Sequence, residues 1–373
     1  MSLPATYKTV VSTVTEDGQL RLEMVEKPMP VPKEDQVLIR VEATPINPSD
    51  HGVMFGWADM SKATNEGDAL VAPVPTAGMR MMKGRIGQAL PIGNEGAGTV
   101  VAAGDSPAAQ SLMGKTVAAM GGGMYAEYRV VPIMQVLPLN EGNTAREGAS
   151  SFVNPLTALC FPETMRNEGH KAIVHTAAAS NLGQMLVKIC KADDIPLVNI
   201  VRREEQANIL KGLGATHIVN SSDEDFIPQL IDAVHETGAT LAFDATGGGK
   251  LASDILTAME GAAARTPGAY SIYGSVHHKQ VYLYGGLDVS PTVLTRGYGM
   301  AWGVGGWLLP NFLAKAGMET AIRLRQRVAD ELTTTFASHY TDDLNLAEML
   351  KAENVARYNA KKTGEKFLVT PHA

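Results

Sequence analysis

The sequence contains very little cysteine. Its 373 residues include two, Cys160 and Cys190, which are too few for a disulfide framework and lack the C-x-x-C spacing of metal and redox motifs. Both lie in apolar stretches typical of helices, where a thiol is more often buried and inert than reactive. A cysteine-based zinc site is therefore excluded, and we expect no bound metal.

Long apolar runs and clusters of like charge are also missing. The net charge is −7, from 39 acidic and 32 basic residues, without a run of one sign, which disfavours nonspecific nucleic-acid binding. Residues 1–18 are polar and carry no secretory signal pattern. The uncharged stretch 297–311 is glycine-rich and shorter than the ~20 apolar residues of a membrane span. We expect a cytoplasmic protein that binds neither nucleic acid nor membrane.

The first part of the chain shows the alternating polarity of short strands. Hydrophobic residues make up 45% of the sequence, and its length exceeds the size at which one core stops growing, so two domains are expected. We read a β-rich module to about residue 150, in which residues 57–90 have no sustained period and form an irregular surface insertion. The strand-like segments are residues 8–14, 20–25, 36–43, 93–104, 115–120 and 125–132.

The period changes at Lys171, where strand-like and helical segments begin to alternate. Helices of about ten residues between strands imply right-handed crossovers and a parallel sheet, so this part is a doubly wound α/β domain. The predicted strands are residues 172–175, 197–201, 217–220, 241–244 and 270–273, and the predicted helices are 181–192, 204–213, 225–236 and 250–260. We expect the further strand at 280–284 to pair edge to edge across the two-fold axis of a homodimer, and the C-terminal tail to return to the first module.

The first strand of this domain leads into a turn of small residues. Ala178, Ser180 and Gly183 take the three positions of a G-x-G-x-x-G dinucleotide fingerprint, so two of its glycines are replaced. Such a turn lets the backbone approach a pyrophosphate at the positive end of the following helix. The alternative is an ordinary strand–loop–helix connection capped by Ser180 or Asn181.

Other loops at the carboxyl ends of the strands favour NADPH. Arg202 and Arg203 stand about 20 residues beyond the fingerprint, where NAD sites place an acid, and guanidinium groups suit a 2′-phosphate. Alternatively, the two arginines pair with Glu204 and Glu205. The glycine-rich segment 302–307 carries two tryptophans, which suit either plain packing or a wall beside a nicotinamide ring.

Five motifs occur in the order and spacing of a known family: residues 47–50 (Asn-Pro-Ser-Asp), 93–98, 154–158, 177–183 and 214–219. Together they resemble the medium-chain dehydrogenase/reductase superfamily. The resemblance implies a GroES-like β-rich catalytic domain (1–155 and 330–373) and a Rossmann dinucleotide-binding domain (156–329). Zinc enzymes of the superfamily carry Cys at the position of Asn47 and His at that of Asn94. The chain is therefore similar to the zinc-free branch, the quinone oxidoreductases and 2-enoyl thioester reductases.

The resemblance also implies the site residues and the reaction. The residues expected to bind NADPH are Asn47, Asn154, Thr157, Ala179, Ser180, Asn181, Leu182, Arg202, Arg203, Tyr273, Gly274, Trp307 and Lys366. The expected reaction is zinc-independent hydride transfer from NADPH to a quinone or an α,β-unsaturated carbonyl, a small electrophilic substrate. Asn47, Asn94 and Tyr298 are possible hydrogen-bond donors to the developing oxyanion, although each has a plain structural role as an alternative, and no catalytic residue is assigned.

The enoyl reductases carry a catalytic tyrosine shortly after the Asn-Pro-Ser-Asp motif. Here that region reads Phe55-Gly-Trp57, so the tyrosine is missing. The alternative function is therefore a crystallin-like or redox-sensor protein that binds NADPH without significant turnover.

Overall fold

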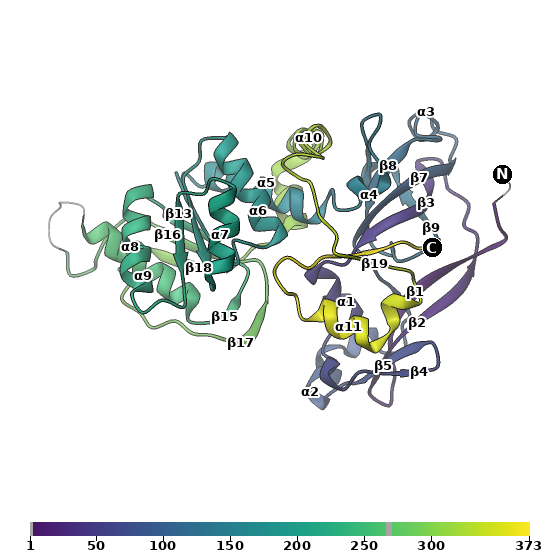
Figure 1. Ribbon diagram of the computed structural model, residues 1–373, viewed down its shortest axis with the longest axis horizontal. Coiled ribbons are helices and arrows are strands. Elements are labelled where there is room, and N and C mark those ends of the chain that lie inside the picture. The colour runs from purple at the N-terminus through teal and green to yellow at the C-terminus, as the bar shows by residue number, and fades with distance from the viewer. Residues whose placement is uncertain (1–2, 266–270) are drawn as a thin grey trace. The chain divides into compact units, whose positions relative to one another are not determined.

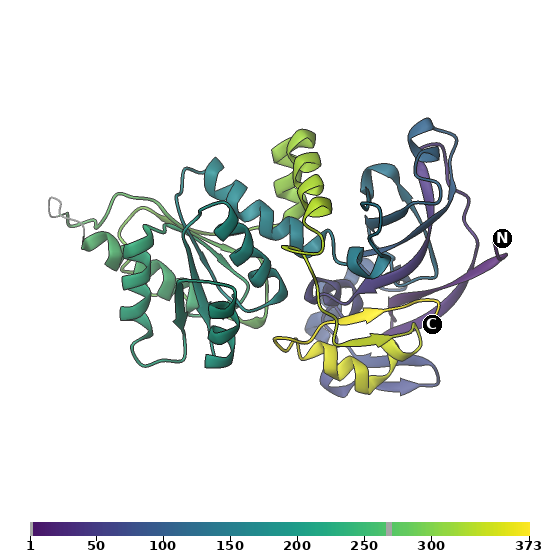
Figure 2. The same ribbon diagram turned by 45° about the horizontal axis from the view of Figure 1, so that its top comes forward.

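The computed structural model describes residues 3–265 and 271–373. The chain divides into two units, residues 1–153 with 325–373 and residues 154–324, each of which is traced in Figures 1 and 2. The sequence predicted divisions at 155/156 and 329/330. Within the described part of the chain, no helix has the length and apolar character needed to cross a bilayer.

The first unit is built mainly from antiparallel strands. Its two sheets have the strand orders β4-β5-β2-β1-β6 and β10-β8-β7-β3-β20-β19, with β9 paired to β3. The six predicted strands are all present within a few residues. The strands are β1 (Thr6–Val14), β2 (Gln19–Pro28), β3 (Gln36–Pro45), β4 (Thr64–Glu66), β5 (Ala69–Pro73), β6 (Leu90–Pro91), β7 (Glu95–Ala103), β8 (Thr116–Met120), β9 (Tyr128–Pro132), β10 (Val136–Pro138), β19 (Asp342–Leu344) and β20 (Phe367–Val369).

Short helices connect these strands. The α-helices are α1 (His51–Met54), α2 (Thr76–Met81), α3 (Pro107–Gln110), α4 (Ala145–Gly148) and α11 (Ala352–Asn359), and the 3-10 turns are η1 (Pro48–Asp50), η2 (Met60–Lys62), η3 (Lys83–Arg85), η4 (Ile133–Gln135) and η5 (Glu348–Leu350). The C-terminal tail returns to this unit as predicted, because β20 pairs with β3.

The prediction of an irregular surface insertion at 57–90 was wrong. β5 pairs with β2 in the first sheet, and Leu70 and Val74 are buried in the same core as Met54 and Met82. The misreading has a physical reason: the strand is only five residues long and apolar on both faces, so it shows no alternation.

The second unit is a parallel sheet with helices. Its strand order is β13-β12-β11-β14-β16-β18, and every pairing is parallel, which confirms the doubly wound fold. The strands are β11 (Ile173–His175), β12 (Leu197–Val201), β13 (His217–Asn220), β14 (Leu241–Asp244), β16 (Lys279–Leu283) and β18 (Trp302–Gly306), with a small separate pair β15 (Gly247–Gly249) and β17 (Asp288–Thr292). The helices are α5 (Val153–Asn167), α6 (Asn181–Ala192), α7 (Glu204–Gly212), α8 (Phe226–Thr237), α9 (Leu251–Ala264) and α10 (Leu309–Asp330), the last interrupted at Gly317.

The fifth strand of the sheet was predicted at the wrong place. Tyr270 lies outside the described residues, and residues 271–273 are not a strand. The segment expected to lie free at an edge is instead β16, which pairs with β14 on one side and β18 on the other. β18 escaped recognition because three of its five residues are glycine, which has little strand propensity. The edges of the sheet are therefore β13 and β18, so any edge-to-edge pairing cannot use β16.

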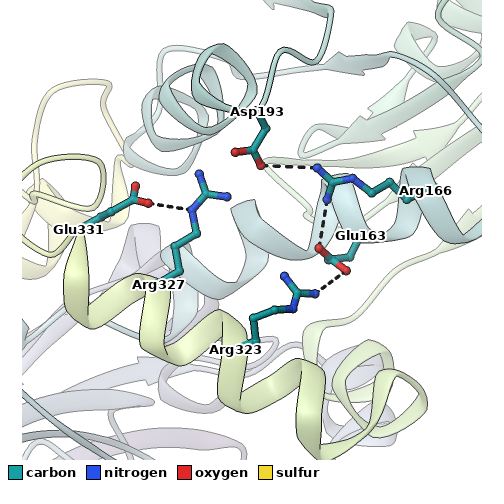
Figure 3. Close-up of polar contacts among 6 residues, drawn as sticks. All are labelled: Glu163, Arg166, Asp193, Arg323, Arg327 and Glu331. Atoms are coloured by element: carbon teal, nitrogen blue, oxygen red, sulfur yellow. Dashed lines mark hydrogen bonds and ion pairs between the residues drawn. The ribbon is translucent and has the colours of Figure 1, made fainter.

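Ion pairs tie α5 to its neighbours within the second unit. The Glu163 carboxylate accepts hydrogen bonds from Arg166 (3.1 Å) and Arg323 (2.9 Å), and Arg166 lies 3.5 Å from Asp193 (Figure 3). Figure 3 also shows the pair Arg327–Glu331, in which Arg327 lies in the last turn of α10 and Glu331 directly follows that helix. The contacts of Glu163 and Arg166 fix α5, which carries Asn154 and Thr157 near its start.

Candidate cofactor site

The turn after β11 has the geometry of a dinucleotide turn. Ser180 is the N-cap of α6, and its Oγ accepts a hydrogen bond from the backbone N–H of Gly183 (3.1 Å). A Cβ atom on Gly183 would collide with the carbonyl oxygen of Ala178, a backbone atom that cannot move aside. α6 therefore packs too closely on the turn for any side chain at this position, which is the role of the third fingerprint glycine.

The donor set at this turn fits a pyrophosphate. Ala178 and Ala179 are buried and add no bulk, while the first-turn N–H groups of α6 and its dipole favour an anion at the helix start. Asn154 donates from Nδ2 to Oδ1 of Asn181 (2.8 Å), so the second unit brings these two predicted residues together. Ser180 therefore caps α6, as in an ordinary strand–loop–helix connection, and also belongs to a turn whose shape suits a phosphate group.

Arg202 and Arg203 are exposed at the carboxyl end of β12. The main chain of Arg202 is held on both sides, since its N–H donates to Oε1 of Gln206 (2.9 Å) and its carbonyl accepts from Oγ of Ser222 (2.9 Å). The carboxylate of Glu204 is paired with Lys211 (2.9 Å) rather than with either arginine. The alternative prediction, that the two arginines pair with the neighbouring glutamates, is therefore wrong for Glu204.

The ends of β11, β14 and β16 carry a buried polar network. Oγ1 of Thr176 donates to Oδ1 of Asp244 (2.6 Å), which also accepts from the N–H of Thr246 (2.8 Å) and so fixes the loop before β15. Nε2 of His175 lies 2.8 Å from the hydroxyl of Tyr284, and burial lowers the pKa of His175 to about 3, so the imidazole is neutral.

Tyr273 and Gly274 do not lie at the carboxyl end of a strand, so their predicted position was wrong. They precede β16, and the next residue, Ser275, contacts Lys279 at the amino end of that strand (2.7 Å). The Tyr-Gly pair at the carboxyl end of β16 is Tyr284-Gly285. A Cβ on Gly285 would lie 2.6 Å from the carbonyl oxygen of Ala245. Sequence analysis missed Tyr284 and Gly285. The adjacent glycines Gly285 and Gly286, which follow the strand-like run 280–284, could have indicated that a strand ends there.

Trp307 is a packing residue of the second unit. Its Nε1 donates to Oγ1 of Thr164 (3.1 Å), and its ring meets Phe161 edge-on with centroids 5.0 Å apart and stacks on Phe312. Tyr298 likewise has the plain structural role that was the alternative to a donor role. It is fully buried, and its hydroxyl accepts a hydrogen bond from the N–H of Thr295 (2.7 Å).

The first unit contains a buried polar cluster around Asn47. The N–H of Asn47 donates to Oδ2 of Asp50 (2.7 Å), and its Nδ2 donates to Oε1 of Glu95 (2.8 Å). Glu95 also accepts from the N–H groups of Phe152 (2.7 Å) and Val153 (3.0 Å). Burial raises the pKa of Glu95, and these hydrogen bonds oppose that shift. Oδ1 of Asn47 is buried and has no hydrogen-bond partner. An unpaired buried acceptor is costly, so this atom is available to a ligand that donates a hydrogen bond.

Charged groups surround this cluster. Burial raises the pKa of Asp50 to about 7, although the N–H groups of Asn47 and Asn94 oppose the shift. Burial lowers the pKa of Lys366 to about 8, opposed by the negative charges of Glu95 and Asp50. Lys366 and Asn47 thus both belong to the buried cluster of the first unit. Asn94 lies at its border, with Nδ2 3.1 Å from Oγ of Ser49. Nowhere in residues 3–265 or 271–373 do three or more His, Cys, Asp or Glu side chains gather as metal ligands would.

A β-rich unit and a parallel α/β unit with this turn define a two-domain, dinucleotide-dependent oxidoreductase. Comparison with known families agrees: residues 33–141 match the family described as "Alcohol dehydrogenase GroES-like domain", and residues 182–297 match "Zinc-binding dehydrogenase". The chain belongs to the medium-chain dehydrogenase/reductase superfamily, as the sequence predicted, and the relatives it matches are of the zinc-free branch.

Three similar proteins span most of the chain. Prostaglandin reductase-3 of Mus musculus is 27% identical over 359 residues, which cover 92% of this chain and 84% of that protein. A Mesorhizobium loti structure provisionally described as an NADPH:quinone reductase is 27% identical, with a TM-score of 0.75 and 100% of both chains covered. A mycobacterial protein solved in complex with NADPH has the same fold, with a TM-score of 0.67 at 19% identity over 98% of this chain and 100% of that one.

Proposed function

We propose that the protein is an NADPH-dependent oxidoreductase that reduces a quinone or an α,β-unsaturated carbonyl without zinc. The observation that carries the proposal is the pair Arg202–Arg203, which stands exposed at the end of β12, where an NAD site places an acid. The names of two relatives, a prostaglandin reductase and an NADPH:quinone reductase, support this class of reaction.

Residues of the second unit would hold most of the cofactor. The turn 178–183 would take the pyrophosphate, the two arginines the 2′-phosphate, and Asn154 and Thr157 would line the start of α5. Tyr284 and Gly285 replace Tyr273 and Gly274 in this assignment, because they lie at the carboxyl end of β16. Bound NADPH would supply the hydride, and the protein would supply orientation and electrostatics.

The cluster around Asn47 leaves one atom of its amide unpaired. Nδ2 donates a hydrogen bond to Oε1 of Glu95 (2.8 Å), and the buried Oδ1 is left as an acceptor without a partner. The unpaired Oδ1 suits a ligand group that donates a hydrogen bond, such as a hydroxyl group. Lys366, a cation in the same cluster, would stabilise negative charge that develops near it.

The cofactor preference is tested by replacing both arginines. We expect NADPH to bind more tightly than NADH, and the double variant R202A/R203A to lose roughly 30- to 150-fold in NADPH affinity with little change for NADH, since each exposed charge-assisted contact contributes about 1–1.5 kcal/mol. Isothermal titration calorimetry measures both constants. K211A, which removes an exposed cation from the following helix, α7, is the control and should keep the preference. A double variant that still prefers NADPH would disprove the 2′-phosphate assignment.

A second candidate function is NADPH binding without turnover. It is favoured by Phe55, which occupies the region of the family tyrosine, has no hydroxyl group, and is buried against Tyr358 with ring centroids 6.3 Å apart. Oxidation of NADPH at 340 nm with a panel of quinones and enones, with and without a chelator, separates the two functions. Tight binding of NADPH without its oxidation would favour binding without turnover.

The homodimer and the cytoplasmic location stay predictions. A monomer by sedimentation would exclude the homodimer.

A further inference from the structure

The first unit has a cavity of about 370 Å³ beside α1. Its walls come from α1 and from the segment 57–90, to which the sequence assigned no role. The lining residues are Gly52, Gly56, Trp57, Met81, Met82, Gly84 and Arg85. The cavity thus has one cation, one large aromatic ring and two thioethers around a border of glycines.

Arg85 is the cation, and all of its partners are neutral. Its Nη1 donates to the carbonyl of Val53 (2.9 Å) and its Nη2 to Oγ of Ser12 (2.8 Å), while Nε is buried without a partner. Among the residues described by the structure, no carboxylate lies within 4.0 Å of its guanidinium. Burial lowers the pKa of Arg85, with no acidic group opposing the shift. A half-buried cation without a counter-charge is unfavourable, and an anion in the cavity would offset that cost.

Trp57 and Met81 supply an apolar surface that the fold leaves open. Their exposed fractions are 59% and 68%, high for such side chains beside a cavity. The backbone of Trp57 is fixed, because its N–H points at the sulfur of Met82 (3.4 Å) and a Cβ on Gly78 would lie 2.7 Å from the Cβ of Trp57. An exposed indole on a fixed backbone, next to a flexible thioether, suits a flat apolar group.

We propose that this cavity binds a small carboxylic acid with a flat apolar body. The carboxylate would pair with Arg85, and the apolar body would lie against Trp57 and Met81. A site of this kind combines an apolar wall with one charged group that fixes orientation. The proposal concerns binding within the first unit alone, and so holds or fails independently of the reduction proposed above.

The test compares an acid with its neutral amide on the full-length protein without NADPH. Isothermal titration calorimetry with 3-phenylpropanoate and 3-phenylpropanamide, neither of which has a reducible double bond, should show the acid binding roughly tenfold more tightly, a factor expected for one charge-assisted contact. R85M should abolish this preference and R85K should keep part of it. R80M replaces an exposed arginine on α2 that does not line the cavity, and this control should behave as the unmodified protein. W57L should weaken the acid and the amide by similar factors.

Three results would overturn the proposal: equal binding of acid and amide, no binding of either in the millimolar range, or a preference that survives in R85M. Because Arg85 also holds Ser12 and Val53, thermal melting must show that R85M is folded. If it is not, W57L decides the matter, and unchanged binding of 3-phenylpropanoate by W57L would be sufficient to reject the site.

Discussion

Replacing Lys279 by methionine should destabilise the second unit. Lys279 begins β16 and is 1% exposed, and its Nζ lies 2.7 Å from Oε2 of Glu260, 2.7 Å from Oγ of Ser275 and 3.1 Å from the carbonyl of His277. Methionine has nearly the same length and fills the same space, so the variant removes the charge and the three hydrogen bonds with little change in packing.

The expected cost follows from the burial of the two partners. Breaking a buried ion pair by removing one side costs about 3–5 kcal/mol, most of it from the charge left behind. The remaining charge here is Glu260, whose side chain is 16% exposed and which keeps hydrogen bonds from the N–H (2.8 Å) and Oγ (2.6 Å) of Ser275. Glu260 is therefore partly solvated and satisfied, so we expect about 2–3 kcal/mol, below the fully buried case.

The same pair predicts a pH dependence with a definite sign. Burial alone would raise the pKa of Glu260, but hydrogen bonds from Lys279 and Ser275 hold it below the ordinary value of 4.5. A carboxyl group with a depressed folded-state pKa stabilises the fold above its unfolded pKa, and this contribution is lost as the pH falls through the folded pKa. K279M should therefore lose less stability than the unmodified protein between pH 5 and pH 3.

Urea unfolding followed by tryptophan fluorescence in a W57F background measures this effect, because the remaining tryptophans, Trp302 and Trp307, both lie in the second unit. E260Q and the double variant E260Q/K279M complete a thermodynamic cycle, in which the coupling should reach about 1 kcal/mol or more. A loss below 0.5 kcal/mol in K279M (roughly the range of neutral surface changes), or a coupling near zero, would refute the reasoning.

Two further outcomes are expected. Y273A should leave the dissociation constant of NADPH within about twofold, whereas Gly285→Val should weaken binding by roughly tenfold or more, because the new Cβ would lie 2.6 Å from the carbonyl of Ala245 at the carboxyl end of the sheet. Isothermal titration calorimetry measures the NADPH dissociation constants of both variants. Equal losses of affinity would support the original assignment of Tyr273 to the cofactor site. Because burial raises the pKa of Asp50 to about 7, its folded form binds a proton that the unfolded form has released above about pH 4, so stability should fall as the pH rises from 4 to 7. D50N should lack this decline in urea unfolding at pH 5 and pH 8, and parallel curves for the two proteins would contradict it.

The features that the sequence predicted correctly are those specified by neighbouring residues. The turn after β11 is one: Ser180 caps α6 through a hydrogen bond to the N–H of Gly183, three residues away, and every residue needed to recognise it lies within one short segment. The first four parallel strands were equally readable, because each is a short apolar run between helices with clear ends.

The misplaced fifth strand shows where local reasoning stops. Two of the Tyr-Gly pairs in this region, Tyr273-Gly274 and Tyr284-Gly285, flank the strand-like run 280–284, and local sequence lets either follow a strand. The choice depends on β16 lying between β14 and β18, and β18 is a glycine-rich strand whose place in the sheet comes from pairing and not from propensity. Strand pairing at that distance has no local signature.

Asn47 makes the same point for chemistry. The residue stands where a zinc enzyme has a ligand, and its amide could in principle donate to a substrate oxygen or accept from a cofactor hydroxyl. Glu95, 48 residues away, sets the orientation of this amide by accepting a hydrogen bond from Nδ2, which leaves Oδ1 as an unpaired acceptor. Glu95 is held in turn by the N–H groups of Phe152 and Val153, which require its carboxylate to accept. The orientation of the Asn47 amide, with Oδ1 left as a buried acceptor, therefore follows from hydrogen bonds that join three separate segments of the first unit.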